Sequence, residues 1–428
     1  MTERPAATVI VSTYNWSSAL RCALRSVQLQ TLADIEVLVV GDGCTDDSAA
    51  VVASIADPRF RWHNLPENTG SQSGPNNAGL ALARAEWVAY LGQDDIWHPR
   101  HLEVCLAAAA AQGADFIASA TIMYGPPGSG WRAMSGLLVD GTYGPRDFMP
   151  PSSWLHRKAV ATQIGSWKDP AETLLPVDAT FLKEAAEAGA RIGGTDEVTV
   201  FKFNAAWRRD AYRLRPTGEQ EAMIARIETG EDFRARELLD VMRAVAADRY
   251  VRTDMPLPPP PSELSYFRRN RLHKGAEERF AREALQVADG PMRFGIDEPG
   301  HFQWHGRENS PVFGTFRWTG PSPRAEATLP VLFDRPLSLE LCIVHAIEPA
   351  ALDRLKLFVQ GVETPHVRHR DDTGVHILHC GPIPPPAEPG PLEITFDVGQ
   401  TKRPYDVSGS TDRRWLGVAV AWVEVRPA

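Results

Sequence analysis

The sequence predicts an α/β domain built on a mostly parallel sheet flanked by helices, then a helical linker region and a C-terminal all-β sandwich. In the first half of the chain, short apolar runs rich in β-branched residues alternate with helical patterns, as in parallel α/β sheets. From about residue 295, short strand patterns alternate with Gly and Pro turns, as in sandwiches. At roughly 100–200 residues per domain, a chain of 428 residues needs more than one core. We therefore expect three domains, over residues 1–215, 216–290 and 291–428.

The first four predicted strands alternate with helices. The strands are expected over residues 8–12, 35–40, 60–65 and 87–91. The helices between them are expected over residues 17–27, 49–55 and 78–85. In the first helix, Leu20, Leu24 and Val27 recur at the spacing of one helix face. This order of elements predicts parallel strands with helices on both faces of the sheet.

Further elements complete the first two domains. We expect a helix over 101–111, then strands over 115–123 and 198–203. The Gly-rich stretch 125–130 is either a mobile loop that closes over a bound molecule or a hairpin tip, and we favour the tip. Residues 219–249 are helical by composition and interrupted at Gly230, with these apolar positions: Met223, Ile227, Leu238, Leu239, Met242 and Val245. A stiff proline-rich spacer over 256–261 and a short charged helix over 277–287 follow.

The composition excludes several classes of protein. A hydrophobic content of 43% and a charged content of 23% are ordinary for a globular protein. The net charge of −9 argues against a nucleic-acid partner, which usually needs a basic face. The five cysteines are scattered and form no C-x-x-C pair, which argues against a disulfide framework or a zinc site. The N-terminal residues 1–7 are polar and lead straight into the first predicted strand, so we expect no signal peptide, and the apolar run 104–123 is too interrupted to cross a bilayer. We expect a cytoplasmic protein, and peripheral contact with a membrane stays open.

Two adjacent carboxylates, Asp94 and Asp95, follow the apolar strand 87–91 directly. Such neighbours repel each other and cannot enter a core unpaired. A divalent cation would make the pair favourable, because hard cations take oxygen ligands. The alternative is a solvated turn at the end of a strand.

Polar residues also follow two other predicted strands. Ser12, Thr13 and Tyr14 end the first strand, and Asp42 ends the second. In a parallel sheet, ligands bind at the carboxyl ends of the strands, so these residues should meet the acid pair there. The chain has no G-x-G-x-x-G and no G-x-x-x-x-G-K-[ST], which argues against a dinucleotide site and a phosphate loop. A nucleotide bound without such a loop would need a metal ion on its diphosphate, and the acid pair could hold one.

Four motifs in this order resemble those of glycosyltransferase family 2. They are T-V-I-V-S-T-Y-N, V-L-V-V-G-D-G-C-T-D-D-S, the pair N-T-G and N-x-G, and Y-L-G-Q-D-D-I-W-H-P. The resemblance covers about residues 8 to 215. It implies an inverting enzyme with a Rossmann-like GT-A fold, a nucleotide-sugar donor and a divalent metal. Within the family, the chain is similar to the spore-coat polysaccharide transferase type, whose acid pair also follows a non-acidic residue and precedes a His-Arg pair.

Three positions depart from the family pattern. Gly41 and Gly92 stand where the family often has an acid, and Asn76 stands where it often has an arginine. Each departure removes a charged contact to the nucleotide. The resemblance therefore constrains the fold more tightly than the donor.

The resemblance implies a division of roles among the polar residues. The contacts to the nucleotide sugar would come from Ser12, Thr13, Tyr14, Asp42, Asn77 and Asp94. In this scheme Tyr14 stacks on the base, Asp42 accepts a hydrogen bond from a base N–H, and Asp94 holds the ribose hydroxyls. Asp95 would bind Mg²⁺ or Mn²⁺ on the diphosphate, where the ion neutralises the leaving group. Alternatives stay open: an ordinary strand-end aromatic for Tyr14 and a helix cap for Asp42.

Asp178 occupies the place of the family's catalytic base. Such a carboxylate takes the proton of the acceptor hydroxyl and is typically worth roughly 10²–10⁴-fold in rate. The position also suits a helix N-cap, which is the structural alternative. His156 could contact a phosphate or a metal, or it could be a structural histidine. Arg208 and Arg209 could clamp a diphosphate or an anionic acceptor, or form a solvated basic face.

The C-terminal sandwich has its own candidate residues. Its segment 316–321 resembles a jelly-roll-like module appended to some bacterial family 2 transferases. Four tryptophans are candidates for either sugar binding or the core: Trp304, Trp318, Trp415 and Trp422. Four histidines suggest a metal cluster only superficially: His366, His369, His376 and His379. Strand alternation should split these histidines between the two faces of the sheet.

Together these features predict a metal-dependent inverting glycosyltransferase. It would use a nucleotide-diphosphate donor, with a UDP-sugar favoured because UDP is the family's commonest donor nucleotide, and Mn²⁺ or Mg²⁺ as cofactor. Its acceptor would be a saccharide or a lipid-linked molecule in the synthesis of cell-surface polysaccharide. Two alternatives remain: a sugar-binding scaffold with an inactive transferase domain, and a nucleotidyltransferase. The latter would usually want a Gly-rich basic loop after the first strand, where this chain has Ser12-Thr13-Tyr14-Asn15.

Overall fold

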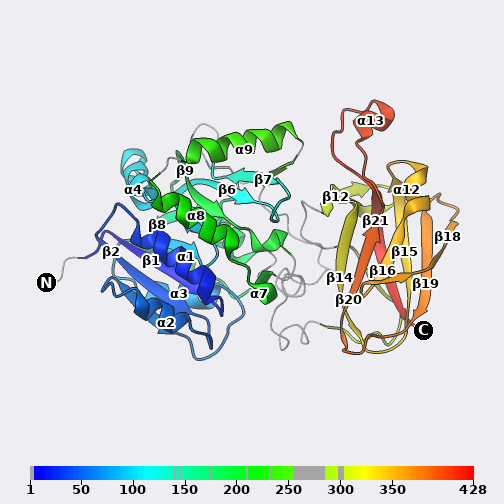
Figure 1. The fold of residues 1–428 in the computed structure, drawn as a ribbon, viewed down its shortest axis with the longest axis horizontal. Coiled ribbons are helices and arrows are strands. Elements are labelled where there is room, and N and C mark those ends of the chain that lie inside the picture. The colour runs from blue at the N-terminus through cyan, green and yellow to red at the C-terminus, as the bar shows by residue number, and fades with distance from the viewer. Residues whose placement is uncertain are drawn as a thin grey trace. The chain divides into compact units, whose positions relative to one another are not determined.

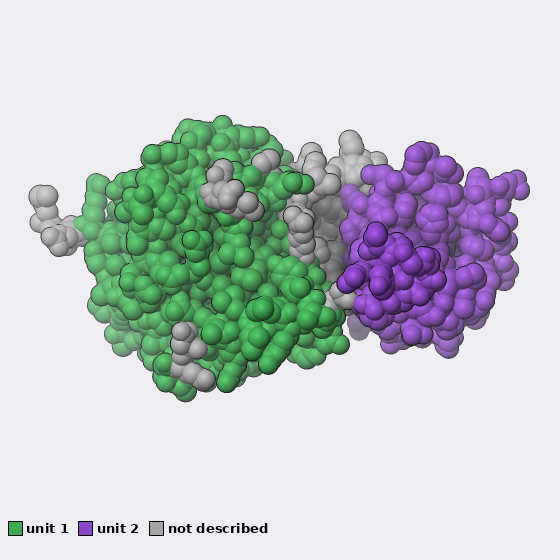
Figure 2. Space-filling model, turned by 90° about the horizontal axis from the view of Figure 1, so that it is seen from above, with its two compact units in different colours: residues 1–259 green, residues 260–428 purple. Residues whose placement is uncertain are grey.

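The computed structural model divides the chain into two compact units, residues 1–259 and 260–428 (Figure 2). It describes residues 4–138, 141, 143–144, 146–170, 172–173, 175–208, 211–230, 233–247, 249–253, 285–296 and 303–428. The predicted proline-rich spacer and most of the predicted helix over 277–287 lie outside these residues.

Within the described residues of unit 1, ten strands form one sheet in which the four predicted strands lie together (Figure 1). They are β1 (Ala7–Thr13), β2 (Ile35–Gly41), β3 (Phe60–Asn64) and β4 (Trp87–Gly92). β2 pairs in parallel with β1 and β3, and β1 pairs in parallel with β4. The predicted parallel arrangement is confirmed for this half of the sheet.

The other half of the sheet is mixed. It contains β5 (Ile96–Trp97), β6 (Phe116–Tyr124), β7 (Arg132–Ser135), β8 (Trp154–Arg157), β9 (Ile192–Lys202) and β10 (Tyr250–Arg252). β8 runs antiparallel to both β4 and β6, whereas β9 runs parallel to β6. β6 and β7 form an antiparallel hairpin, so the Gly-rich stretch 125–130 lies at its tip, as predicted.

Alternating residues of the parallel strands supply two separate cores. Val9 and Val11 of β1 pack with helices α1 (Ser17–Gln28), α2 (Ser48–Ser54) and α4 (His101–Gln112). Ile10 packs with α3 (Ser73–Leu82), α5 (Lys158–Ile164) and α6 (Val177–Glu187) on the other face. Because side chains alternate along a strand, both faces of a buried strand are apolar and both need a helical layer.

Helix α3 begins at Ser73, five residues before the predicted start. Pro75 stands in its first turn, where a proline removes no intrahelical hydrogen bond. Gly79 allows the helix to lie close to the sheet, because a Cβ there would sit 2.6 Å from Cγ2 of Ile10. Residues 73–77, with Pro75 among them, therefore belong to the helix, which we expected to begin at residue 78.

The three helices α7 (Ala211–Leu214), α8 (Gly218–Glu228) and α9 (Arg234–Ala246) follow the last long strand. Met223 and Ile227 of α8 and Val241 of α9 are buried against Ile122 and Phe201 of the sheet. Four of the predicted apolar positions on α9 are exposed instead: Leu238, Leu239, Met242 and Val245. These helices belong to unit 1, and α8 and α9 lie in the stretch 216–290 that we expected to form a helical extension and linker.

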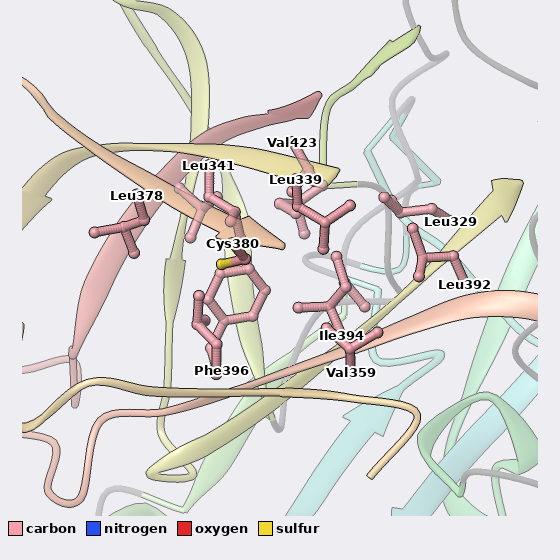
Figure 3. Close-up of a cluster of buried hydrophobic side chains, with 14 of the residues drawn as sticks. Leu329, Leu339, Leu341, Val359, Leu378, Cys380, Leu392, Ile394, Phe396 and Val423 are labelled. Carbon is pink, nitrogen blue, oxygen red and sulfur yellow. The ribbon is translucent and has the colours of Figure 1, made fainter. Parts of the chain in front are cut away.

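Unit 2 is an antiparallel sandwich, as predicted. One sheet contains β11 (Met292–Phe294), β12 (Trp304–Ser310), β13 (Gly314–Thr319), β15 (Leu337–Ala346), β18 (His366–Arg370), β19 (His376–Ile383) and β21 (Val418–Pro427). The other contains β14 (Arg324–Phe333), β16 (Lys356–Val359), β17 (Val362–Thr364) and β20 (Gly390–Asp397). Two short helices, α12 (Pro349–Arg354) and α13 (Pro404–Ser408), connect strands. Leu339 and Val423 of the first sheet face Ile394 and Phe396 of the second across the core (Figure 3).

The candidate residues of the sandwich divide between core and surface. Trp304 is fully buried in the core, whereas Trp318, Trp415 and Trp422 are partly exposed. The histidines are split between the two faces of the sheet, as predicted. His369 and His379 share one face and stack with ring centroids 4.8 Å apart, whereas the register of β18 and β19 places His366 and His376 on the other face. Across the described part of the chain, no group of three or more His, Cys, Asp or Glu residues is placed to hold a metal ion.

Candidate active site

The ends of three parallel strands are joined by hydrogen bonds at the carboxyl edge of the sheet. Asp42, after β2, donates its backbone N–H to the carbonyl oxygen of Thr13 over 2.8 Å. The hydroxyl of Thr13 in turn donates to Oε1 of Gln93, after β4, over 2.6 Å. The predicted convergence of the polar residues after β1, β2 and β4 is therefore confirmed.

The loop after β1 is fixed through its backbone. Gln93 is buried, and its Oε1 also accepts the backbone N–H of Tyr14 over 2.9 Å. Asn15 has a positive φ of 44°, and its Oδ1 accepts the backbone N–H of Thr45 over 2.7 Å. Ser12 and the Tyr14 side chain remain partly exposed. The loop is thus rigidly held while its side chains stay accessible to a ligand.

Asp42 is buried and bound to the loop after β3. Its Oδ1 accepts hydrogen bonds from the backbone N–H and the hydroxyl of Thr69, over 2.9 and 2.8 Å. Its Oδ2 accepts the backbone N–H of Gly70 over 3.2 Å. The carboxylate therefore closes this loop onto β2, and a base N–H would have to share it with the loop.

Gly41 explains one departure from the family pattern. A Cβ at this position would sit 2.3 Å from Oδ1 of Asn64 and 2.6 Å from the ring of Trp62. The acid that the family often has here would collide with both side chains. The neighbouring strand has thus taken the space of the missing carboxylate.

The two asparagines of α3 have different surroundings. Asn77 donates from Nδ2 to the carbonyl oxygen of Trp167, and its Oδ1 accepts the Trp167 N–H, both over 2.9 Å. Its amide is therefore engaged by protein backbone, although a nucleotide-sugar contact was predicted for it. Asn76 is buried, and both polar atoms of its side chain lack a hydrogen-bond partner among the described residues.

Asp94 and Asp95 are buried in the turn between β4 and β5. Asp94 is 8% exposed and Asp95 is 0% exposed, so the alternative of a solvated turn is wrong. The backbone carbonyl of Asp94 accepts a hydrogen bond from Gln220 of α8 over 3.1 Å. Both carboxylates lie beside Gly92, whose Cβ, if present, would be 3.2 Å from an oxygen of each.

Asp95 has two partners on one oxygen. Its Oδ2 accepts the hydroxyl of Ser152 over 2.6 Å and lies 2.8 Å from Nζ of Lys202. The Ser152 oxygen also accepts the backbone N–H of Gly92 over 3.1 Å. The other carboxylate oxygen, Oδ1, is buried and has no hydrogen-bond partner among the described residues.

Lys202, the last residue of β9, is the site residue that the sequence analysis missed. Burial lowers the pKa of its ammonium group, but the attraction of Asp95, Asp94 and Asp178 outweighs burial and raises this pKa above its ordinary value. Lys202 is therefore charged, and its side chain is 21% exposed. The available signal was a single lysine among the apolar residues of strand 198–203.

Asp178 lies in the first turn of α6, one residue after the start of the helix. The positive end of the helix dipole stabilises a carboxylate there. Its Oδ1 accepts the backbone N–H of Ala179 over 2.9 Å, and its side chain is partly exposed. The charge of Asp178 is among those that raise the pKa of Lys202.

His156 and Arg208 are occupied within the fold. His156 is fully buried, with Nδ1 2.8 Å from the carbonyl oxygen of Arg157 and Nε2 3.2 Å from the Tyr90 hydroxyl. Arg208 donates to the carbonyl oxygens of Tyr124 and Gly125 and pairs with Glu219 at 2.9 Å. In this conformation neither residue offers its polar group to a diphosphate. Arg209 lies outside the described residues.

The acid pair fits a cation that takes some of its ligands from elsewhere. Oδ1 of Asp95, which has no hydrogen-bond partner among the described residues, is the kind of oxygen that Mg²⁺ or Mn²⁺ prefers, and Asp94 is the preceding residue of the chain. Mg²⁺ commonly binds through one or two carboxylates and completes its shell with water and phosphate oxygens. Two carboxylates are therefore sufficient protein ligands, but the ion would share Asp95 with the Lys202 ammonium.

Comparison with known proteins relates the first part of the chain to a protein family. Residues 8–166, which include β1 to β4 and the acid pair, match the model of the family described as Glycosyl transferase family 2. Unit 1 carries a glycosyltransferase family 2 domain. Its mixed sheet with helices on both faces is a GT-A-like arrangement. The resemblance that the motifs predicted is thereby confirmed.

The family 2 domain has named relatives. It is 38% identical over 110 residues to the succinoglycan biosynthesis protein ExoO of Rhizobium meliloti, covering 26% of this chain and 31% of that protein. It is 29% identical over 147 residues to the poly(ribitol-phosphate) β-N-acetylglucosaminyltransferase TarP of Staphylococcus aureus, covering 34% and 44%. The chain thus spans less than half the length of either relative.

A solved structure is also similar. The structure of S. aureus TarS 1–349 in complex with UDP-GlcNAc matches with a TM-score of 0.39 and 21% identity, over 46% of this chain and 58% of that one.

Among the residues that the structure describes, none of the helices is long and apolar enough to traverse a lipid bilayer.

Proposed function

We propose that the protein is an inverting, metal-dependent glycosyltransferase that moves a sugar from a nucleotide diphosphate to an acceptor hydroxyl. One observation carries the proposal: at the carboxyl edge of a family 2 sheet, the fully buried Asp95 keeps one carboxylate oxygen without a hydrogen-bond partner among the described residues, while its other oxygen lies 2.8 Å from Nζ of Lys202. Neither a binding scaffold nor a structural role requires buried acids that leave a carboxylate oxygen without a partner.

In this proposal Asp178 is the general base. It takes the proton of the acceptor hydroxyl while that oxygen attacks the anomeric carbon. The bond between this carbon and the diphosphate oxygen breaks, and its electron pair leaves with the nucleoside diphosphate. Asp94 holds the ribose hydroxyls, Ser12, Thr13 and Tyr14 line the base site, and Asp95 ligates the metal. When bound, Mn²⁺ or Mg²⁺ neutralises charge on the leaving diphosphate.

For the donor we favour a UDP-sugar, because UDP is the commonest donor nucleotide of the family that the motifs resemble. For the acceptor we favour a saccharide or a lipid-linked molecule in surface polysaccharide synthesis, because the similar proteins include a succinoglycan biosynthesis protein and a poly(ribitol-phosphate) β-N-acetylglucosaminyltransferase. Such a role would place the protein at the cytoplasmic face of a membrane.

Donor hydrolysis tests the proposed function. The purified protein is incubated with a panel of nucleotide sugars, with and without Mn²⁺, and release of nucleoside diphosphate is measured. We expect metal-dependent release, which the isosteric change Asp95→Asn abolishes. Full activity of Asp95→Asn in the presence of metal would contradict the role of Asp95. Absence of both turnover and nucleotide binding would favour the scaffold, and pyrophosphate release from a sugar phosphate and a nucleoside triphosphate would favour the nucleotidyltransferase.

The variant Asp178→Asn tests the base separately. It keeps the size of the side chain but removes proton uptake, so we expect donor hydrolysis to fall by about 10²–10⁴-fold with nucleotide affinity unchanged. Glu187→Gln is the matched control, because Glu187 lies on the same helix and its side chain is exposed. Equal activity of Asp178→Asn and Glu187→Gln would exclude Asp178 as the base.

A further inference from the structure

We infer that Lys202 is a built-in countercharge of the acid pair that competes with a divalent cation for Asp95, so that the metal is held firmly only together with a diphosphate. The inference rests on the proposed function, because it takes Asp95 as the metal ligand. It concerns a residue of this chain for which neither the motifs nor the family resemblance suggested any role.

The contact between Lys202 and Asp95 is direct. Nζ lies 2.8 Å from Oδ2 of a carboxylate that is fully buried. The charges of Asp94 and Asp178 add to that of Asp95 in raising the pKa of Lys202.

A second buried ion pair shows what a purely structural arrangement looks like in this protein. Glu36 of β2 is buried, and its Oε1 accepts the Thr8 hydroxyl and the Arg84 N–H, both over 2.6 Å. Its Oε2 pairs with Arg84 and Arg61, over 2.7 and 2.8 Å. Both oxygens of Glu36 are satisfied, whereas Asp95 keeps one buried oxygen without a partner. The Asp95 site is therefore incomplete in a way that the structural pair is not.

An ammonium group on the metal ligand has a predictable electrostatic effect. A divalent cation at Oδ1 of Asp95 and the Lys202 ammonium at Oδ2 would lie on one carboxylate and repel each other. The affinity of the site for the free ion is lowered by this repulsion. A diphosphate brings negative charge to both cations and relieves the repulsion, so its binding and that of the metal strengthen each other reciprocally.

Titration with Mn²⁺ alone tests the inference without any measurement of activity. Mn²⁺ affinity is measured by electron paramagnetic resonance for the wild type and Lys202→Met, each with and without UDP. We expect Lys202→Met to bind Mn²⁺ without nucleotide on the order of tenfold more tightly than the wild type, which is within the usual range of coupling between two sites. We also expect UDP to raise Mn²⁺ affinity more in the wild type than in Lys202→Met. Equal Mn²⁺ affinities of the two proteins without UDP would overturn the inference.

Two controls separate charge from packing. Lys202→Arg keeps the positive charge and should keep the weak binding of free Mn²⁺. Lys183→Met removes an exposed lysine that pairs with Glu187 on α6, and should leave Mn²⁺ affinity unchanged. If Lys202→Met does not fold, the wild-type protein alone still tests the inference, because tight binding of Mn²⁺ to the wild type without UDP would contradict it.

Failure of the inference differs from failure of the proposed function. Donor hydrolysis by the wild type with no change of Mn²⁺ affinity in Lys202→Met would overturn the inference alone. The expected change of affinity in a protein that turns over no nucleotide sugar would overturn the proposed function and leave the competition at Asp95 standing.

Discussion

At the scale of single residues, the site depends on which polar atoms the fold has already used. Asp42 and Asn77 were predicted from the same motifs as Asp95, but the structure uses their side chains to hold loops. Of these three residues, Asp95 is the one that combines full burial with a carboxylate oxygen that has no hydrogen-bond partner in the described part of the chain. The residue types and their order in the chain suggested a ligand contact for all three residues. The hydrogen bonds of the structure distinguish a side chain that holds a loop in place from one that can bind a ligand.

His156 makes a prediction about stability and pH. Burial lowers its pKa from 6.5 to about 4, although its contact with the carbonyl oxygen of Arg157 acts the other way. A histidine with a lowered folded-state pKa contributes fully above about pH 6.5, and its contribution is lost as pH falls towards 4. The loss amounts to about 3 kcal/mol over this range. We expect the urea midpoint of unfolding to fall steeply between pH 6.5 and pH 4.

The variant His156→Phe tests this assignment. Its ring suits the aromatic neighbours Phe116, Tyr90 and Phe181, while its stability cannot depend on protonation. We expect a smaller loss of stability with falling pH in His156→Phe than in the wild type, whatever its stability at pH 7. His63→Gln, which changes an exposed histidine of β3, should retain the wild-type pH dependence. Identical pH slopes for His156→Phe and the wild type would refute the prediction.

Lys202 shows why part of the site could not be predicted from the sequence. Asp94 and Asp95 could be predicted from the sequence, because two adjacent carboxylates at the end of an apolar strand are unfavourable unless something balances their charge. A single lysine at the end of another strand has an ordinary explanation, which is solvation of its charge. It joins the site because β9 pairs with β5, where Phe201 lies opposite Ile96, and this pairing brings Lys202 beside Asp95 although the two strands are far apart in the sequence.

At the scale of elements, alternation of apolar residues predicted the parallel strands well but placed the start of α3 too late. Gly and Pro residues favour loops locally, and tertiary packing overrides this preference when the helix must approach a strand closely. The same packing makes a testable prediction. In Gly79→Ala, the new Cβ would sit 2.6 Å from Cγ2 of Ile10. We expect a loss of about 1–3 kcal/mol in the free energy of unfolding, as is typical for overpacking a core.

Gly218→Ala is the matched control for Gly79→Ala. Gly218 is the first residue of α8, and a Cβ there would meet no atom within 4 Å. Alanine favours helix more than glycine does, so this change should leave stability unchanged or raise it slightly. Both variants are compared by urea denaturation monitored through far-ultraviolet circular dichroism. Equal stability of Gly79→Ala and the wild type would show that α3 shifts away from the sheet at little cost.

At the scale of the whole molecule, the change of sequence texture near residue 295 predicted a separate sandwich, and the structure confirms one. What the texture could not decide was the assignment of the helices between the two sheets. Helices α8 and α9 lie in the stretch between the two predicted sheets. Apolar residues of both helices pack on the sheet of unit 1. Gln220 of α8 even holds the backbone of Asp94, so this helix contributes to the candidate site.

The division into two units predicts that each unit folds when it is expressed as a separate fragment. Every described residue assigned here to the candidate site lies between Ser12 and Gln220, within unit 1, and the sandwich core is formed by residues of unit 2 alone. We therefore expect the fragment 1–259 to bind UDP with the affinity of the full chain, measured by calorimetry. The fragment 260–428 should unfold cooperatively and show the circular dichroism of β-structure, because its two sheets already enclose a core. A fragment 1–259 that folds but has lost UDP binding would mean that the sandwich takes part in the donor site.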